Sequence, residues 1–325
     1  MGAWRVLVTS RSFLEAAPEA VRRLEEAGVH LLRASRDRPL EEEELADLLG
    51  EVDGIIAGVD RIGPRALQKG APRLRVIARV GVGVDTIDLR AATDLGVVVT
   101  NTPGLNAEAV AELVFGVMIV LARRILEVDR WVREGRWIRP FGVELSGKCL
   151  GVVGFGHIGQ AVARRGVGFG MRVVAFDPWV DPEVARGLGA TLVPFLEVIE
   201  SADFLTLHVP LLPETRHLVG VEELRRMKPT AYLINASRGG VVDEAALARA
   251  LREGWIAGAA CDVFEEEPPL HSPLLEAPNV VLTSHIGGHT WEAAARAARL
   301  AAEQVLRVLR GERPPHVVNP EVFNR

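Results

Sequence analysis

Three polar segments follow apolar runs of the chain, and together they carry side chains suited to moving a proton and a hydride. Arg238 lies in NASRGG at 235–240, Glu267 in DVFEEEP at 262–268, and His285 in SHIGG at 284–288. Arg238 can bind a carboxylate and the oxygen on the neighbouring carbon. His285 can take up or return a hydroxyl proton because imidazole titrates near neutral pH, and Glu267 can hydrogen-bond that ring and favour its charged form. The three side chains predict oxidation or reduction at C2 of a small 2-hydroxy or 2-oxo acid.

Each of these residues has a simpler interpretation when it is taken alone. Arg238 can be a surface arginine, the acidic run at 265–267 a solvated segment, and His285 a helix-cap residue. In open parallel sheets, however, ligands bind where strands end, and all three segments follow predicted strands. That shared position favours the catalytic interpretation.

A glycine pattern offers a binding site for the hydride carrier. Residues 150–153 are predicted to form a strand, Gly154, Gly156 and Gly159 form a G-x-G-x-x-G turn, and a helix is expected to follow. Such glycines allow a tight turn, a close approach of pyrophosphate and close packing of helix on strand, while the helix N-terminus favours the phosphate charge. The pattern alone is weak in a chain with 32 glycines, so its context has to decide.

Asp177 provides that context. It ends the next predicted strand, at 171–176, about 20 residues beyond the turn, where a carboxylate can accept hydrogen bonds from the adenosine ribose. The same charge would repel the 2′-phosphate of NADP, which predicts NAD as the cofactor. The alternative makes Asp177-Pro178 an ordinary turn after a strand. The order of strand, turn, helix, strand and acid favours NAD binding.

Alternating strands and helices predict the α/β class, with a doubly wound parallel sheet in the second half of the chain. In the first half, strands are expected at 5–10, 52–57, 75–80 and 97–99, and helices at 18–28, 64–69 and 106–124. In the second half, strands are expected at 172–176, 204–208, 231–236, 257–263 and 280–284, and helices at 159–168, 221–227, 243–253 and 291–310.

Length and composition exclude several functional classes. A chain of 325 residues exceeds what one hydrophobic core comfortably holds, so two domains are expected. The net charge of −5 gives no basic field for nucleic acid, and no nucleic-acid partner is expected. The longest apolar stretch, 113–122, is about half of the roughly 20 residues that a membrane span needs, so it is predicted to be a buried helix.

The cysteines and the N-terminus indicate the compartment. Cys149 and Cys261 lie in apolar runs without CxxC spacing, which predicts buried, reduced thiols. No export signal is recognisable at the start of the chain, and a cytoplasmic location is expected. No spacing typical of metal ligands is present, so no metal is expected.

The chain resembles the D-isomer-specific 2-hydroxyacid dehydrogenase family, which includes D-3-phosphoglycerate, glycerate and formate dehydrogenases, over nearly its whole length. The matching stretches are RVGVGVDTID at 79–88, NTPG at 101–104, AEL at 111–113, GFGHIG at 154–159, HVPL at 208–211 and the three catalytic segments. The resemblance implies two doubly wound parallel-sheet domains, with a Rossmann NAD-binding domain at 102–288 inserted into a flavodoxin-like substrate-binding domain at 1–101 and 289–325. It also implies a cleft that closes on the substrate.

The resemblance implies a role for each site residue. The catalytic trio is Arg238, Glu267 and His285, with Glu267 chosen over its neighbours because it directly precedes Pro268. The substrate-binding residues are Gly81, Val82, Gly83, Arg238 and His285. The cofactor-binding residues are Gly154, Gly156, His157, Ile158, Gly159, Asp177, Val209, Pro210, Ala236, Ser237, Asp262, Gly287 and Gly288. Among these, His157 and Ile158 are expected at the pyrophosphate, Asp177 at the ribose and Asp262 at the nicotinamide amide.

The resemblance leaves the substrate open. The stretch 78–85 looks most like the D-3-phosphoglycerate dehydrogenase branch, which acts in serine biosynthesis, in a short form because the chain ends at Arg325 without a serine-sensing regulatory domain. A substrate phosphate would require positive charge in the N-terminal loops; Arg61 could supply it, but Asp60 opposes it. D-3-phosphoglycerate is the first expectation, and glyoxylate or hydroxypyruvate reduction is the closest alternative.

Two further expectations concern partners and the remaining histidines. A corepressor-like protein that senses NAD(H) is an alternative of a different class, because such proteins share the fold and the trio, although the short tails disfavour it. The Trp- and Arg-rich stretch at 130–140 is predicted to be an exposed excursion. The family expectation is a homodimer built around the helix at 106–124 and the arm from Trp131 to Trp137 within that stretch. His208, His217 and His289 are expected to be structural or solvent-facing, although His289 could help to shape the site.

Overall fold

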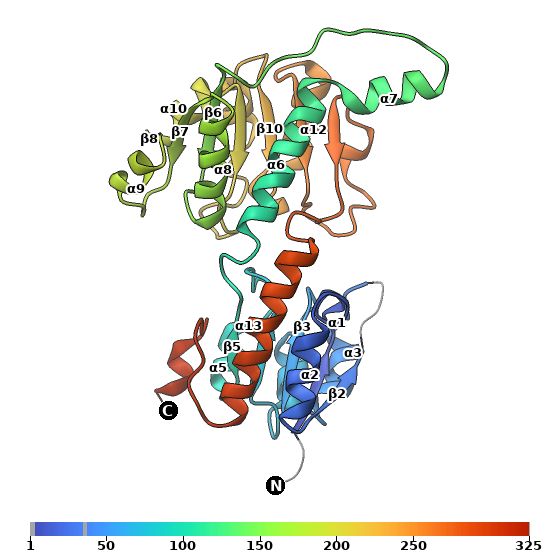
Figure 1. Cartoon of the computed structure of the whole chain (residues 1–325), viewed down its shortest axis with the longest axis vertical. Coiled ribbons are helices and arrows are strands. Elements are labelled where there is room, and N and C mark those ends of the chain that lie inside the picture. The colour runs from blue at the N-terminus through green and yellow to red at the C-terminus, as the bar shows by residue number, and fades with distance from the viewer. Residues whose placement is uncertain (1–3, 35–37, 325) are drawn as a thin grey trace. The chain divides into compact units, whose positions relative to one another are not determined.

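The computed structural model describes residues 4–34 and 38–324, which form two compact units (Figure 1). Unit 1 comprises the described residues of Met1–Asn106 and Gly288–Arg325, and unit 2 is Ala107–Gly287. Each unit is built on one sheet in which all the paired strands are parallel. The predicted α/β class with two parallel-sheet domains is confirmed.

The sheet of unit 1 has the strand order β2-β1-β3-β4-β5, which is the flavodoxin-like order. Its strands are β1 (Trp4–Val8), β2 (Val29–Arg33), β3 (Gly54–Ala57), β4 (Val76–Arg79) and β5 (Val98–Thr100). Its helices are α1 (Arg11–Ala16), α2 (Pro18–Glu26), α3 (Glu42–Leu49), α4 (Pro64–Gly70), α5 (Leu89–Asp94) and α13 (Trp291–Leu309). A 3-10 turn, η3 (Pro320–Phe323), follows α13.

Alternating side chains of these strands fill two separate cores, one on each face of the sheet. Val6 and Val8 of β1 pack with α1, α2 and α13, whereas Leu7 between them packs with α3 and α4. Successive side chains of a strand point to opposite faces, so a strand covered on both sides must be apolar throughout. This explains the continuous apolar runs of β1, β3 and β4.

The sheet of unit 2 has the order β12-β11-β10-β9-β6-β7-β8, which is the Rossmann arrangement with one additional strand. Its strands are β6 (Cys149–Val153), β7 (Arg172–Phe176), β8 (Ala190–Leu192), β9 (Phe204–Leu207), β10 (Tyr232–Asn235), β11 (Gly258–Cys261) and β12 (Val280–Leu282). Its helices are α6 (Ala107–Ala122), α7 (Ile125–Arg133), α8 (His157–Gly168), α9 (Pro182–Gly187), α10 (Phe195–Ser201), α11 (Val221–Arg226) and α12 (Glu244–Glu253). Two 3-10 turns, η1 (Gly239–Val241) and η2 (Pro273–Glu276), complete the unit.

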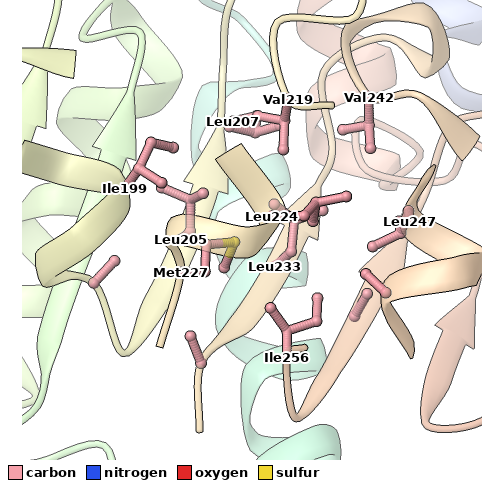
Figure 2. Packing of buried hydrophobic residues seen from close by; sticks show 14 of the residues in the cluster. Ile199, Leu205, Leu207, Val219, Leu224, Met227, Leu233, Val242, Leu247 and Ile256 are labelled. Atoms are coloured by element: carbon pink, nitrogen blue, oxygen red, sulfur yellow. The ribbon is translucent and has the colours of Figure 1, made fainter. Parts of the chain in front are cut away.

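Two cores also sandwich this sheet. On one face, Leu205, Leu207 and Leu233 pack against α10, α11 and α12, as Figure 2 shows from close by. On the other face, the sheet packs against α6 and α8. The switch in strand order lies between β6 and β9, and ligands of such sheets bind at the carboxyl ends of the strands beside that switch.

Several sequence predictions can be compared directly with this structure. The apolar run at 113–122 lies within α6, whose side chains are largely buried, as predicted. Among the described residues, no helix is both long and apolar enough to cross a membrane. Cys149 and Cys261 are free and buried, as predicted, and burial, together with nearby Glu244 and Asp262, raises the pKa of the Cys261 thiol to about 12.

The short edge strands and several short helices were not predicted from the sequence. Strand β2 lies at the edge of its sheet and is only partly buried, and β8 has three residues, so neither gives a continuous apolar run. Helix α7 begins at Ile125 and includes the first residues of the stretch at 130–140, which was predicted to be an exposed excursion. None of its nine residues is buried, as that prediction requires, although the helix itself was not predicted.

Candidate active site

The glycine turn between β6 and α8 has the geometry that a dinucleotide requires. Gly154 has φ +90°, and a Cβ there would lie 2.6 Å from the His208 carbonyl oxygen. A Cβ at Gly159 would lie 2.1 Å from the Gly154 carbonyl oxygen, so helix and turn pack backbone to backbone. At Gly156, in contrast, an added Cβ meets no atom within 4 Å, which leaves a surface that a pyrophosphate can approach. The three glycines thus have three different physical roles.

Two neighbouring elements complete this site. His157 and Ile158 form the first turn of α8, where N–H groups and the helix dipole favour a phosphate. Asp177 follows β7 directly, and its carboxylate accepts hydrogen bonds from the Phe155 N–H at 2.7 Å and the Trp179 N–H at 2.9 Å. Asp177 is therefore fixed beside the glycine turn by backbone donors, as an acceptor for ribose hydroxyls requires.

The predicted nicotinamide end of the site lies at the carboxyl ends of β9, β10 and β11. Val209 and Pro210 follow β9 and are partly or fully exposed, whereas Ser237, after β10, is buried. Ala236 and Asp262 line a hollow together with Thr283, and the floor of this hollow is formed by apolar side chains of α6. The geometry thus brings these predicted residues to one edge of the sheet.

His285 and Glu267 form a hydrogen-bonded pair. The distance between His285 Nδ1 and Glu267 Oε2 is 2.8 Å, and each side chain keeps 38% of its surface exposed. The other carboxylate oxygen of Glu267 accepts a hydrogen bond from the Phe264 N–H at 3.1 Å. With Nδ1 engaged by a carboxylate, the ring presents Nε2 as the atom that can exchange a proton with a substrate.

Asp262 holds the backbone that carries His285. The Asp262 carboxylate accepts hydrogen bonds from the Thr283 hydroxyl at 2.6 Å and from the N–H groups of Ile286 and Gly287 at 2.8 Å each. The His285 N–H donates to the Asp262 carbonyl at 2.8 Å, and His285 itself has φ +55°. Such a left-handed conformation costs energy in a non-glycine residue, so these hydrogen bonds maintain a strained position at the site.

Arg238 lies on the segment between β10 and η1, and its backbone is held by Asn235. The Asn235 side chain donates to the Arg238 carbonyl at 3.0 Å and accepts from the Ser237 N–H and hydroxyl. A Cβ at Gly239 would lie 1.8 Å from the Phe264 carbonyl carbon, so the segment after Arg238 touches the backbone of the segment that carries Glu267. The two segments that carry Arg238 and Glu267 are therefore in direct backbone contact.

The residues predicted to bind the substrate carboxylate form a braced loop in unit 1. The Gly81 carbonyl accepts a hydrogen bond from the Thr102 N–H at 2.9 Å, and the Val82 carbonyl accepts one from the Asn101 side chain at 2.8 Å. The Gly83 carbonyl accepts one from the Arg79 guanidinium at 3.0 Å. These contacts fix the loop through its carbonyl groups.

Gly287 and Gly288 follow His285 and are separated by the boundary of the two units. A Cβ at Gly287 would lie 2.9 Å from the Asp262 carboxylate, and one at Gly288 would lie 3.0 Å from the Asn106 side chain. Both positions are thus too closely packed for a larger residue without a shift. Among the residues that the structure describes, no group of three or more potential metal ligands occurs.

The other histidines differ in their surroundings. Burial lowers the pKa of His208 to about 3; its Nε2 lies 2.9 Å from the Thr206 hydroxyl, and its Nδ1 has no hydrogen-bond partner among the described residues. His217 hydrogen-bonds Glu265 at 3.1 Å, and His289 is exposed. Sequence reasoning missed Glu244, a buried carboxylate beside the trio, because no local spacing relates it to Glu265 and Ser272.

Comparisons with known proteins identify the family. Residues 115–287 match the model of the NAD binding domain of the D-isomer specific 2-hydroxyacid dehydrogenases. The chain is 45% identical over 288 residues to a glyoxylate reductase of Thermococcus litoralis, covering 86% of this chain and 87% of that protein. It is 44% identical over 304 residues to a D-3-phosphoglycerate dehydrogenase of Methanocaldococcus jannaschii, covering 93% of this chain and 57% of that protein.

A solved structure has the same fold. The crystal structure of the TT0316 protein from Thermus thermophilus superimposes with a TM-score of 0.87 at 40% identity, covering 97% of this chain and 99% of that one. The family explains the two parallel sheets and the open glycine turn together. The chain belongs to the D-isomer-specific 2-hydroxyacid dehydrogenase family, and its second unit is the NAD binding domain of that family.

Proposed function

We propose that the chain reduces small, unphosphorylated 2-oxo acids, with glyoxylate and hydroxypyruvate as the favoured substrates. The observation that carries this proposal is the environment of Asp60, in the loop after β3. Asp60 is 4% exposed, and its carboxylate accepts hydrogen bonds from the Thr9 hydroxyl, the Gly58 N–H at 3.1 Å and the Leu40 N–H at 2.9 Å. Thr9 and Gly58 directly follow β1 and β3, and ligands of parallel sheets bind where strands end.

Asp60 opposes a phosphate in two ways. Its carboxylate occupies the hydroxyl and backbone donors with which a phosphate would pair, and its negative charge would repel the phosphate dianion. Arg61, which could compensate, is exposed. The names of the similar proteins support the same choice, because glyoxylate reductase is commoner among them than D-3-phosphoglycerate dehydrogenase.

The residues of the trio would divide the reaction among them. Bound NADH supplies the hydride that C2 of the substrate receives. Arg238 would bind the substrate carboxylate and polarise the C2 carbonyl, while the protonated ring of His285 would donate a proton to the oxygen through Nε2. Glu267, on Nδ1, would keep the ring oriented and favour its charged form. In the reverse direction the neutral ring would accept that proton.

The cofactor and substrate anions would be held mainly by backbone groups. The first turn of α8, with Gly156, would bind the pyrophosphate and Asp177 the ribose hydroxyls. Asp262 would accept a hydrogen bond from the nicotinamide amide. In unit 1, the N–H groups of Val82 and Gly83 would donate to the substrate carboxylate, and the hydrogen bonds from Thr102, Asn101 and Arg79 to the loop carbonyls would hold the loop in place.

We also propose that the protein acts in the cytoplasm as a homodimer. Large apolar side chains are exposed on α7 and the arm that follows it, including Leu126 at 58%, Trp137 at 82% and Phe141 at 101%. Exposed apolar surface of this kind marks an interaction site, and a second copy of the chain would cover it. Light scattering should then give about twice the mass of one 35.2 kDa chain.

A substrate panel tests the proposed specificity. Loss of NADH absorbance is measured with glyoxylate, hydroxypyruvate and 3-phosphohydroxypyruvate, and kcat/KM is expected to be highest for one of the first two. Asp60→Asn should raise the relative kcat/KM for 3-phosphohydroxypyruvate, because it removes the repelling charge and keeps the size of the side chain. A wild-type preference for the phosphorylated acid would overturn the proposal and favour D-3-phosphoglycerate dehydrogenase.

His285→Ala tests the catalytic assignment. This variant should lose at least about 100-fold in kcat, the usual contribution of a general acid, while NADH still binds. Turnover at the wild-type rate would contradict the role of His285. Tight NADH binding without turnover of any 2-oxo or 2-hydroxy acid by the wild type would favour the corepressor-like sensor instead.

A further inference from the structure

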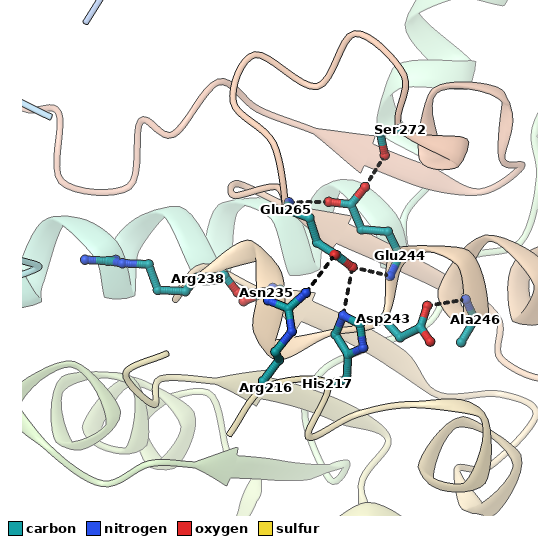
Figure 3. Close-up of polar contacts among 9 residues, drawn as sticks. All are labelled: Arg216, His217, Asn235, Arg238, Asp243, Glu244, Ala246, Glu265 and Ser272. Carbon is teal, nitrogen blue, oxygen red and sulfur yellow. Dashed lines mark hydrogen bonds and ion pairs between the residues drawn. The ribbon is translucent and has the colours of Figure 1, made fainter. Parts of the chain in front are cut away.

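A buried carboxylate next to the trio holds both ends of the loop that carries Glu267. Glu244 is 8% exposed and is the first residue of α12. One of its carboxylate oxygens accepts a hydrogen bond from the Glu265 N–H at 2.6 Å, and the other accepts one from the Ser272 hydroxyl (Figure 3). Glu267 lies between these two residues, so the Glu244 side chain is hydrogen-bonded to both ends of the segment 265–272.

A second set of contacts ties the same loop to the segment after β9. The Glu265 carboxylate accepts a hydrogen bond from the Glu244 N–H at 3.3 Å, lies 3.1 Å from His217 Nε2, and pairs with Arg216 at 3.8 Å. The His217 N–H in turn donates to the Gly240 carbonyl at 2.8 Å, two residues beyond Arg238. In Figure 3 the Arg238 side chain extends away from these carboxylates, so the cluster does not compete for it.

Stabilisation of α12 alone does not account for the position of Glu244. The N-cap of this helix is Asp243, whose side chain already accepts a hydrogen bond from the Ala246 N–H at 2.9 Å. The Glu244 side chain instead turns to the loop at 265–272. Burying a carboxylate is costly unless donors compensate for the lost water, and both donors here come from that loop.

We propose that Glu244 is a positioning residue, which holds the loop so that Glu267 meets Nδ1 of His285. This inference rests on the proposed function, because it assumes that Glu267 and His285 do the chemistry. Without the Glu244 side chain, the loop loses its hydrogen bonds at the Glu265 N–H and the Ser272 hydroxyl and keeps the contacts of the Glu265 carboxylate at one end, so Glu267 can move away from the ring. A displacement of about 1 Å at a catalytic group can cost about 100-fold in rate.

The pH dependence distinguishes positioning from simple stabilisation. In the reduction the charged ring of His285 donates the proton, so activity falls as the pH rises. A ring that has lost the Glu267 charge gives up its proton more easily, so the fall in activity should begin at a lower pH. A residue that only stabilises the fold would leave this midpoint in place.

The test compares four variants of the full chain. Glu244→Ala should lower kcat about 10- to 100-fold and move the midpoint of the pH–rate profile for glyoxylate to a lower pH. Glu244→Gln removes the charge but can still accept from the Glu265 N–H and donate to the Ser272 hydroxyl, so it should restore most of the activity and the wild-type midpoint. Ser272→Ala cuts one attachment only and should give an intermediate midpoint.

Glu266→Gln is the charge control. The charged groups next to the loop include Glu244 on α12, Arg216 and His217 after β9, Asp262 after β11, and His285, so the test needs a control for the loss of negative charge alone. Glu266 is exposed in the same loop, and its neutralisation should leave the midpoint unchanged. Hydrogen exchange gives a readout without substrate: peptides covering 264–272 should exchange faster in Glu244→Ala than in Glu244→Gln.

The outcomes separate this inference from the function on which it rests. If Glu244→Ala lowers the melting temperature but keeps the wild-type midpoint, Glu244 is only structural and the inference is wrong. If Glu244→Ala does not fold, Ser272→Ala decides, and an unchanged midpoint in that variant has the same meaning. If His285→Ala turns over like the wild type, the proposed catalytic roles fail, whatever Glu244 does.

Discussion

Alanine at Gly156 and alanine at Gly159 should fail in opposite ways, because the two glycines face different surroundings. At Gly156 an added methyl group meets no protein atom within 4 Å, and φ is −71°, which alanine adopts without strain. Gly156→Ala should therefore fold with a free energy of unfolding within about 1 kcal/mol of the wild type. The same methyl group would stand where the pyrophosphate approaches, so NADH affinity should fall at least tenfold, which is about 1.4 kcal/mol.

At Gly159 the added Cβ would lie 2.1 Å from the Gly154 carbonyl oxygen and 3.3 Å from a Val152 methyl group. The nearest atom belongs to the backbone, so relief requires helix α8 to move away from the turn. Overpacking of this kind costs about 1–3 kcal/mol or more. For a domain of 150–250 residues, each kcal/mol lowers the melting temperature by about 2–4 °C, so a loss of at least about 4 °C is expected for a cost of 2 kcal/mol.

Two measurements on each variant check this pair of predictions: thermal unfolding followed by circular dichroism, and NADH binding followed by fluorescence. Gly156→Ala should unfold like the wild type and bind NADH weakly. Gly159→Ala should unfold at a lower temperature. Wild-type NADH affinity in Gly156→Ala would refute the placement of the pyrophosphate at this turn, and wild-type stability in Gly159→Ala would refute the packing argument.

Three other predictions concern charged groups in unit 2. Asp177→Ala should weaken binding of NADH relative to NADPH, measured by fluorescence titration, and an unchanged ratio would contradict its role at the ribose. Burial lowers the pKa of His208 to about 3, so between about pH 6.5 and 3 the unfolded chain binds a proton at this ring more readily than the folded chain does. The free energy of unfolding should therefore fall as the pH drops through that range, by about 2 kcal/mol at pH 5. Urea unfolding of His208→Asn should not show this loss. Burial opposes charge on Asp203, but hydrogen bonds from the Cys149 N–H and Lys228 lower the pKa of that carboxyl. The stability that its charged form adds is present above about pH 4 and is lost as the pH falls through the lowered pKa. Asp203→Asn should therefore be less stable than the wild type at pH 7, and the two proteins should become equally stable in acid.

The parts of the fold that could be predicted from the sequence are those with strong local signals. Strands covered on both faces, such as β6 and β9, give continuous apolar runs, and the glycine pattern after β6 predicts a turn that leads into a helix. Strand β2 was not predicted, because it lies at an edge of the sheet and only its first residue is buried. Helix α3 was not predicted, because its first turn is a run of glutamates and only the residues after that run show the apolar, buried face.

Candidate site residues could be proposed from the sequence, but the contacts that arrange them could not. The pairing of Glu267 with His285 was expected from their types, and the structure places Nδ1 and Oε2 2.8 Å apart. The attachment of the loop to Glu244 involves residues 21 and 28 positions apart in the chain. No periodicity of helix or strand relates such positions, so only the tertiary structure reveals that one carboxylate closes the loop.

Asp262 has a second role that its sequence motif does not predict, because it also holds the backbone around His285. A carboxylate offers about four acceptor sites, and three donors already occupy this one: the Thr283 hydroxyl and two backbone N–H groups that follow the strained His285. About one acceptor site is left for the nicotinamide amide that we propose Asp262 binds. Loss of this carboxylate would therefore release His285 from its left-handed conformation as well as weaken the cofactor. Because the two effects arise from one side chain, Asp262→Asn should lower kcat by more than its loss of NADH affinity explains, whereas a residue that only contacts the cofactor would change both in proportion.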